Sequence, residues 1–126
     1  MKSSSFNEEI PGMSANEIFG RFTHMQEYVC IYVPVNSGAV DSEIFANATQ
    51  NEMAKIFGGS SVHHVEGSYL TESGSLASEN TYVVKSFATK ITGVIAEKII
   101  EIASNLKQSL GKDYIAVEYN GKMFFV

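Results

Sequence analysis

Two adjacent histidines are the first place in this sequence to look for a metal site or a proton-transferring group. His63 and His64 lie in a segment rich in Val and Tyr, which favours a β-strand. Neighbouring residues on a strand point to opposite faces, so the two imidazoles cannot bind one ion. His64 and Glu66 are two residues apart and share a face. We expect an ordinary surface pair there, with a titrating or ligand-contacting site as the alternative.

Other patterns that often carry catalysis are explained by secondary structure. Gly67-Ser68-Tyr69 has only one of the glycines of a nucleophile elbow. Gly58-Gly59-Ser60-Ser61 follows a predicted helix instead of preceding one, which fits a helix end better than a phosphate loop. Glu97 and Glu101 lie four apart on the solvated face of another predicted helix. The sequence therefore predicts no catalytic residue, no metal ligand and no cofactor.

Composition narrows the classes of partner. The 126 residues include 9 Lys+Arg and 14 Asp+Glu, a net charge of −5, which disfavours a nucleic-acid partner. Cys30 is the one cysteine and lies in an apolar run, where a thiol behaves as a small buried hydrophobe. The first 13 residues lack an apolar signal region, and no window approaches the roughly 20 apolar residues of a membrane span. We expect a cytoplasmic protein without a membrane contact.

Hydrophobic periodicity and capping residues divide the chain into helices and strands. Residues 1–13 are expected to form a flexible tail, and residues 14–126 a single α+β domain. Within the domain, helices are predicted over 15–26, from 41 or 42 to 57, and over 91–110, and strands over 28–35, 61–70, 81–88 and 114–126, the last folded into a hairpin at Asn120-Gly121. This order predicts a ferredoxin-like βαββαβ sandwich with a C-terminal hairpin and an extra N-terminal helix.

The predicted sheet should have two unlike faces. The run from Tyr28 to Val35 is apolar almost without alternation, which favours a central strand covered on both faces. In a sheet of this fold, however, helices cover one face only, so some strand aromatics must lie on the uncovered face. We predict that Tyr69 and Tyr82, together with His64 and Glu66, belong to a binding site.

Several short motifs accompany this order of elements. They are Ile56-Phe57-Gly58-Gly59 at a helix end, Glu66-Gly67-Ser68-Tyr69 on a strand, Ser73-Gly74 in a turn, Glu79 leading the next strand, and Leu110-Gly111-Lys112-Asp113 before the last strand. The pattern resembles a loose group of uncharacterised small bacterial, plasmid and phage proteins, over residues 28 to 126. Where that group often has Trp after Gly-Ser, this chain has Tyr69. The resemblance implies an accessory protein carried by a phage or mobile element.

Without catalytic residues, the favoured function is a non-catalytic binding protein. With the resemblance, it becomes one that binds and blocks a host defence protein or sequesters a small anionic signal molecule. The alternative is a small cofactor-independent enzyme of the dimeric ferredoxin-like kind, in which His64 or Tyr82 handles protons. A structural or regulatory partner of nucleic acid is disfavoured by the charge.

Assembly is predicted from apolar residues near the two ends of the domain. The chain ends on Met123-Phe124-Phe125-Val126, and an exposed edge strand of this kind is normally covered or paired. Phe19 and Phe22 on the N-terminal helix can brace such a join. We predict a homodimer or higher homo-oligomer with Phe19, Phe22, Phe124 and Phe125 near the interface.

Overall fold

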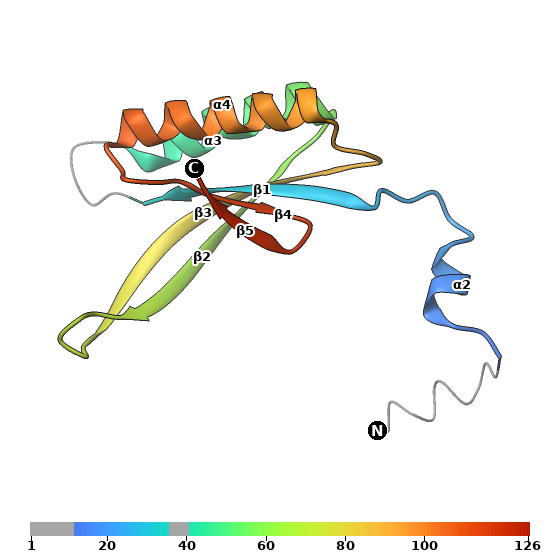
Figure 1. Cartoon of the computed structure of the whole chain (residues 1–126), viewed down its shortest axis with the longest axis horizontal. Helices are drawn as coiled ribbons and strands as arrows, with labels where there is room; N and C mark the ends of the chain where they lie inside the picture. The colour runs from blue at the N-terminus through green and yellow to red at the C-terminus, as the bar shows by residue number, and fades with distance from the viewer. Residues whose placement is uncertain (1–11, 36–40) are drawn as a thin grey trace.

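A computed structural model describes residues 12–35 and 41–126 (Figure 1). Along the chain, its helices and strands are α2 (Ala15–Phe19), β1 (Glu27–Pro34), α3 (Ser42–Phe57), β2 (Ser61–Leu70), β3 (Leu76–Ala88), α4 (Gly93–Leu110), β4 (Ala116–Tyr119) and β5 (Lys122–Phe125). The flexible tail expected over 1–13 falls almost wholly outside the described residues. Within them, no helix is both long and apolar enough to cross a bilayer.

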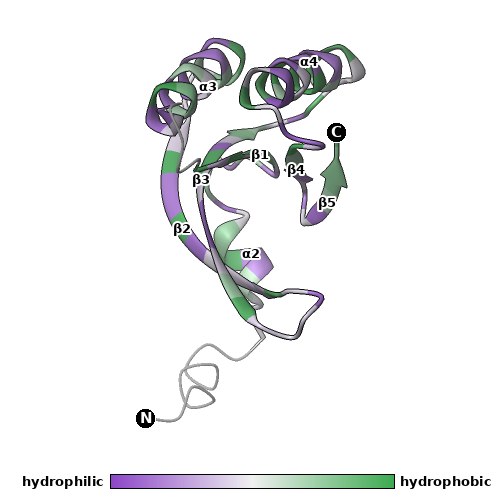
Figure 2. Ribbon diagram, turned by 90° about the vertical axis from the view of Figure 1, so that its left-hand side faces the viewer, coloured by the Kyte–Doolittle hydropathy of each residue, from purple (hydrophilic) through white to green (hydrophobic). Residues whose placement is uncertain are grey.

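The strands form one antiparallel sheet in the order β2-β3-β1-β4-β5. Both α3 and α4 lie on the same face of that sheet (Figures 1 and 2). This arrangement confirms the predicted ferredoxin-like α+β fold, with β5 added at one edge as the second strand of the C-terminal hairpin. The hairpin turn has Asn120 at φ 48° and Gly121 at φ 86°, the left-handed pair that an Asn-Gly type I′ turn requires.

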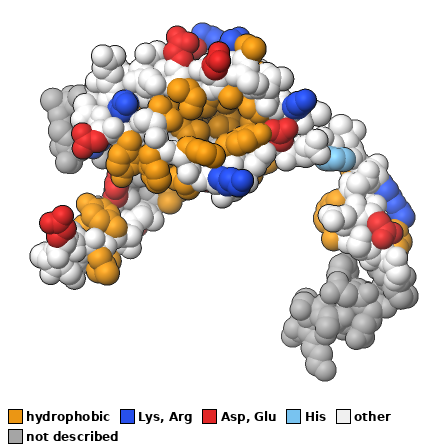
Figure 3. Space-filling view, in the orientation of Figure 1, with side chains coloured by type: hydrophobic (Ala, Val, Ile, Leu, Met, Phe, Trp, Pro, Cys, Tyr) orange, Lys and Arg blue, Asp and Glu red, His pale blue; other side chains and the backbone are white. Residues whose placement is uncertain are grey.

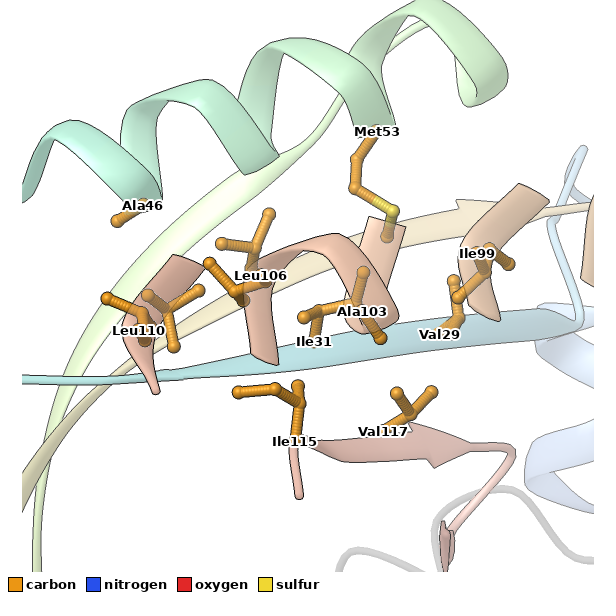
Figure 4. Close-up of a cluster of buried hydrophobic side chains, with 12 residues drawn as sticks. Val29, Ile31, Ala46, Met53, Ile99, Ala103, Leu106, Leu110, Ile115 and Val117 are labelled. Carbon is orange, nitrogen blue, oxygen red and sulfur yellow. The ribbon is translucent and has the colours of Figure 1, made fainter. Parts of the chain in front are cut away.

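The core lies between the sheet and the two long helices. Alternate residues of β1 point into it, because successive side chains on a strand leave from opposite faces. Figure 4 shows how side chains from α3 and α4 meet those of β1 and the C-terminal strand region. The buried cluster consists of Val29, Ile31, Val33, Ala46, Met53, Val84, Ile99, Ala103, Leu106, Leu110, Ile115 and Val117.

Capping residues set the ends of the long helices as their types suggest. The side chain of Asp41 accepts a hydrogen bond from the Glu43 amide, so Asp41, and not Ser42, is the N-cap of α3. Gly58 ends that helix at φ 86°. Thr92 caps α4 in the same way, and Gly111 ends it. A side chain at either glycine would be strained by the positive φ.

The N-terminal helix is shorter than predicted. Ser14 caps α2 as expected by accepting a hydrogen bond from the Glu17 amide. The helix ends at Phe19, with Gly20 at its C-cap, instead of continuing to residue 26. None of its side chains is buried, so no tertiary packing supports a longer helix.

The β2–β3 hairpin is longer than predicted, because β3 begins at Leu76 instead of Thr81. The hairpin extends beyond the rest of the sheet as a two-stranded arm (Figure 1). Its side chains near the turn are exposed, Leu70 and Leu76 among them. The distal part of the arm is therefore held by its own cross-strand pairing and not by the core.

The prediction that β1 is covered on both faces is wrong. Val29, Ile31 and Val33 face the helices, whereas Tyr28 and Tyr32 lie on the face that no described helix covers. The strand looked uniformly apolar because tyrosine rings and a buried thiol give an open face an apolar composition. This uncovered side of the sheet is called the open face below.

Candidate functional site

The open face holds a hydrogen-bonded cluster built from β1 and β4. Tyr28 and Tyr32 are four residues apart on β1, so their side chains share a face. The β1–β4 register places Cys30 opposite Glu118, which brings the carboxylate of Glu118 between the two phenols. Tyr28 Oη donates to Glu118 Oε2 at 2.5 Å, and Tyr32 Oη donates to Glu118 Oε1 at 2.7 Å. We call these three residues the tyrosine–glutamate cluster.

The turn after β4 anchors this cluster. Asn120 Oδ1 accepts a hydrogen bond from the Tyr28 amide at 2.9 Å, and the Asn120 amide donates to the Tyr28 carbonyl at 3.2 Å. The turn that the Asn-Gly pair forms is thereby tied to the beginning of β1. Together with the β1–β4 pairing, this tie fixes the position of Glu118 relative to the phenols.

Hydrogen bonding sets the protonation states of the cluster. The pKa of Glu118 is lowered by the hydrogen bond from Tyr28 and then by that from Tyr32. The pKa of Tyr28 is raised chiefly by its hydrogen bond to the carboxylate, whereas that of Tyr32 is raised first by burial and then by the hydrogen bond. At neutral pH the cluster is therefore one carboxylate held by two neutral phenols.

A lysine and a cysteine complete the centre of the open face. Lys85 Nζ lies 4.3 Å from the centroid of the Tyr28 ring and 4.9 Å from that of Phe87, the geometry of a cation–π contact. Cys30 is buried beneath these side chains, and burial raises the pKa of its thiol to about 11. A protonated, buried thiol is a poor nucleophile, so Cys30 supplies packing at this site.

A pocket of about 380 Å³ opens on the same face and shares Tyr32 with the cluster. It runs across β1, from β3 on one side to the C-terminal strands on the other. The charged and aromatic side chains in its lining are Tyr32, Glu79, Lys112, Asp113, Tyr114 and Phe125. We call this the open-face pocket. Its volume lies within the range of small-molecule sites, roughly 300 to 1,000 Å³.

The lining combines aromatic rings with charges of both signs. Tyr114 and Phe125 meet edge to face, with their ring centroids 5.1 Å apart. Glu79 comes from β3, and Lys112 and Asp113 come from the loop after α4. Rings of this kind bind flat bases and cations, carboxylates bind cationic groups, and an ammonium binds a carboxylate. The pocket suits a ligand with an aromatic base, a cation and a carboxylate.

The predicted binding residues His64, Glu66, Tyr69 and Tyr82 lie elsewhere on the sheet. His64 is paired with Tyr82 across β2 and β3, and the two rings stack at 5.1 Å on the side that faces the helices. Glu66 shares that side of β2, whereas Tyr69 points from the opposite side, near the end of the arm. The structure thus brings His64 and Tyr82 together and leaves Tyr69 apart; their role in binding stays a prediction.

The predicted interface residues also separate. Phe124 is paired with Val117 and faces the helix side of the sheet, whereas Phe125 is paired with Ala116 and lines the open-face pocket. Phe19 and Phe22 are exposed, and α2, which contains Phe19, lies away from β5 (Figure 1). Some strand aromatics do lie on the uncovered face, as predicted, and Phe87 and Phe125 are among them. Tyr82, Tyr119 and Phe124 face the helices.

Sequence reasoning missed Glu118, Tyr28 and Tyr32 as site residues. The signal was the alternation of Tyr28, Cys30 and Tyr32 with Val29, Ile31 and Val33, in which every second residue of the strand carries a polar atom. Glu118 gives a weaker local signal, because its role depends on strand pairing with residues about 90 positions away.

No protein-family model and no curated protein sequence matches this chain. Two solved structures share its fold. A phage SAM lyase in complex with S-methyl-5'-thioadenosine aligns with a TM-score of 0.60 and 18% identity, covering 84% of this chain and 92% of that one. A phage SAM lyase in its apo state aligns with a TM-score of 0.56 and 15% identity, covering 81% and 89%.

These comparisons correct the functional expectation drawn from the sequence. A non-catalytic binding protein that blocks a host protein or sequesters a signal was favoured, because no catalytic residue could be recognised. The two solved structures described above are of a lyase, which is an enzyme, and this chain matches nearly their whole length. The alternative of a small ferredoxin-like enzyme is therefore the better-supported one, although its suggested proton-handling residues, His64 and Tyr82, lie outside the open-face pocket.

Proposed function

We propose that this chain is a lyase that cleaves S-adenosylmethionine in the open-face pocket and releases S-methyl-5'-thioadenosine. The observation that carries the proposal is the pocket itself. The lining of one pocket combines the Tyr114 and Phe125 rings with the Glu79 and Asp113 carboxylates, in a chain that shares its fold with phage SAM lyase. The fold alone does not fix an activity, so the chemistry of the pocket has to support it.

The parts of the substrate match the parts of the pocket. S-adenosylmethionine joins an adenine ring, a positively charged sulfonium and an amino acid with an ammonium and a carboxylate. Tyr114 and Phe125 offer rings for the base and the sulfonium. Glu79 and Asp113 offer carboxylates for the ammonium, and Lys112 an ammonium for the carboxylate.

The products define the bond that breaks. S-methyl-5'-thioadenosine retains the methyl group, the sulfur and the nucleoside, so the bond broken joins sulfur to Cγ of the amino-acid part, and its electron pair goes to sulfur. We propose that an oxygen of the substrate's own carboxylate attacks Cγ and closes a five-membered lactone. No water is consumed, and the neutral thioether and the lactone together contain every atom of the substrate.

This route requires few catalytic groups from the protein. An internal displacement needs no protein nucleophile and no general base, only a substrate folded so that oxygen and Cγ are in line. Attack of a carboxylate on a sulfonium-activated carbon also neutralises opposite charges, so a site that partly excludes water favours it. Tyr32 supports the fold of the substrate, because its hydroxyl is fixed by Glu118 and its ring lines the pocket.

The experiment is incubation of the purified chain with S-adenosylmethionine, followed by chromatography and mass spectrometry of the products. We expect S-methyl-5'-thioadenosine together with the lactone. The double variant Glu79→Gln/Asp113→Asn should lose at least about 100-fold in kcat/KM, since the ammonium loses its two carboxylates.

Glu72→Gln is the matched control, because it removes one carboxylate at the exposed turn of the β2–β3 hairpin, outside the pocket. It should retain the wild-type rate. The proposal would be wrong if the wild-type chain formed no thioadenosine product and S-adenosylmethionine did not raise its melting temperature.

A further inference from the structure

An apolar groove opens between α4 and β5, on the opposite face of the C-terminal hairpin from the open-face pocket. Its volume is about 240 Å³. Ile99, 3% exposed, and Val117, 4% exposed, form its floor, while Ile100 at 43% and Phe124 at 48% lie exposed beside them. Figure 3 shows the apolar side chains gathered between α4 and the hairpin. The hydrophobic core reaches the surface here.

The groove exists because the helix layer is narrower than the sheet. Two helices packed side by side, each about 10 Å in diameter, cover a width of about 20 Å. Neighbouring strands are roughly 4.8 Å apart, so this width corresponds to about four strands. The sheet has a fifth strand, β5, at the edge beside β4. The helix side of β5 therefore has no cover among the described residues (Figure 2).

The same chain carries a segment, residues 14–25, whose aromatic side chains are exposed. Residues 14–25 include Phe19, which is 72% exposed, and Phe22, which is 65% exposed, and α2 has no buried residue. In Figure 1, α2 lies well away from the sheet and the long helices. Exposed aromatic side chains grouped in this way are typical of contact surfaces.

We propose that the groove of one chain receives the segment 14–25 of a second copy of the same chain. The aromatic part of the segment is connected to the start of β1 by residues 23–26. These are Thr23, His24, Met25 and Gln26, and none of them is glycine or proline. A return of the segment onto its own groove would need a chain reversal in those four residues, the kind of turn that glycine and proline normally make. The segment therefore reaches a neighbouring molecule.

Charges beside the groove complement those on the segment. Lys122 precedes Phe124 by two residues and shares its face of β5, and Glu97 follows the groove residue Ala96 on α4. The segment carries Glu17 and Arg21, again one charge of each sign. Each copy gives one segment and receives one, so a closed symmetric assembly would fill every groove.

Light scattering after size exclusion tests the assembly. The wild-type chain should have a mass that is a multiple of 13.8 kDa, and Phe19→Ser/Phe22→Ser should reduce it to 13.8 kDa with an unchanged far-ultraviolet circular dichroism spectrum. Leu70→Ser/Leu76→Ser, which removes equally exposed apolar side chains from the tip of the arm, is the control and should keep the assembled mass.

Cross-linking between two chains tests the contact itself. When Phe22→Cys and Ile100→Cys chains are mixed and oxidised, a covalent dimer of the two should form, whereas Phe22→Cys mixed with Leu76→Cys should give none. A wild-type chain of 13.8 kDa at every concentration would overturn the proposal. So would an assembled mass for the serine variant, or a cross-link that forms only within one chain carrying both cysteines. None of these outcomes depends on the lyase activity.

Discussion

The two faces of β1 differ in the contacts that their side chains make: one face packs in the core, and the other forms the site that we propose for ligand binding. Toward the helices, Val29, Ile31 and Val33 are almost completely buried among apolar side chains. Toward the open face, Tyr28 and Tyr32 bond a single carboxylate and stay partly accessible. One strand can serve both purposes because its side chains alternate. The covered face holds the sheet together, and the open face presents polar groups already fixed in position.

Placing a charge on the covered face should have the largest effect. Ile99→Asp puts a carboxylate where the side chain is 3% exposed, without a partner, so we expect a loss of several kcal/mol, enough to unfold a domain of ordinary stability of about 5–15 kcal/mol. Thermal melts followed by circular dichroism measure it. Ile100→Asp, one residue along and exposed, is the control and should change the stability by about 1 kcal/mol or less. Equal melting curves for the two variants would contradict this account of α4.

Neutralising the carboxylate of the open face should have an intermediate effect, visible in the tyrosines. Glu118→Gln removes the charge that holds the two phenols, so the pKa of both should fall. Tyr28 should fall further toward its ordinary value, because its hydrogen bond to Glu118 is the largest cause of its raised pKa, whereas burial is the largest for Tyr32. Ultraviolet titration of tyrosinate measures the change. Superimposable curves for variant and wild type would show that the cluster does not form.

The same variant gives a pH dependence with a definite sign. The pKa of Glu118 is lowered in the folded state, so its contribution to stability is complete above its ordinary value of 4.5 and is lost as the pH falls through the lowered value. The pKa of each phenol is raised, so that contribution is complete below 10 and is lost as the pH rises through the raised values. The difference in melting temperature between wild type and Glu118→Gln should therefore shrink in acid. A constant difference down to low pH would point to a cause other than the charge.

Removing the thiol should have the smallest effect. Cys30→Ala deletes one buried sulfur and should cost about 1 kcal/mol, with the formation of S-methyl-5'-thioadenosine unchanged, because a protonated thiol takes no part in the proposed reaction. Product assays and melting curves measure the two quantities. A loss of activity without a loss of stability would place Cys30 in the chemistry.

The fold could be predicted because its signals are local. Ser14, Asp41 and Gly58 mark helix ends through their own types, and Asn120-Gly121 specifies a tight turn. The length of α2 could not be predicted, because the residues after Phe19 have helical spacing but α2 has no buried residue whose packing would extend the helix.

The candidate site could not be predicted because it depends on pairing between distant strands. Glu118 becomes significant only when β4 lies against β1. Glu79 lines the same pocket as Tyr114 and Phe125 only because β3 and the C-terminal strands flank the same strand. In the sequence, His64 was a stronger candidate for a functional residue than Glu118. In the structure, its imidazole stacks on Tyr82 on the other side of the sheet. Residue type alone pointed to His64, whereas the pairing of distant strands brings the candidate site residues together on the open face.

The measurement that tests the central claim most directly is the mapping of S-methyl-5'-thioadenosine onto the protein by nuclear magnetic resonance. As the product is titrated, amide signals should shift around the open-face pocket, at Tyr32, Thr81 and Phe125. The Glu79→Gln/Asp113→Asn variant should bind the product about as well as the wild-type chain does, because the product lacks the ammonium that these two carboxylates are proposed to bind. Signals along α3 and in α2 should stay in place. Shifts confined to the groove between α4 and β5, or none at any attainable concentration, would contradict the assignment of the open face as the site of S-adenosylmethionine cleavage.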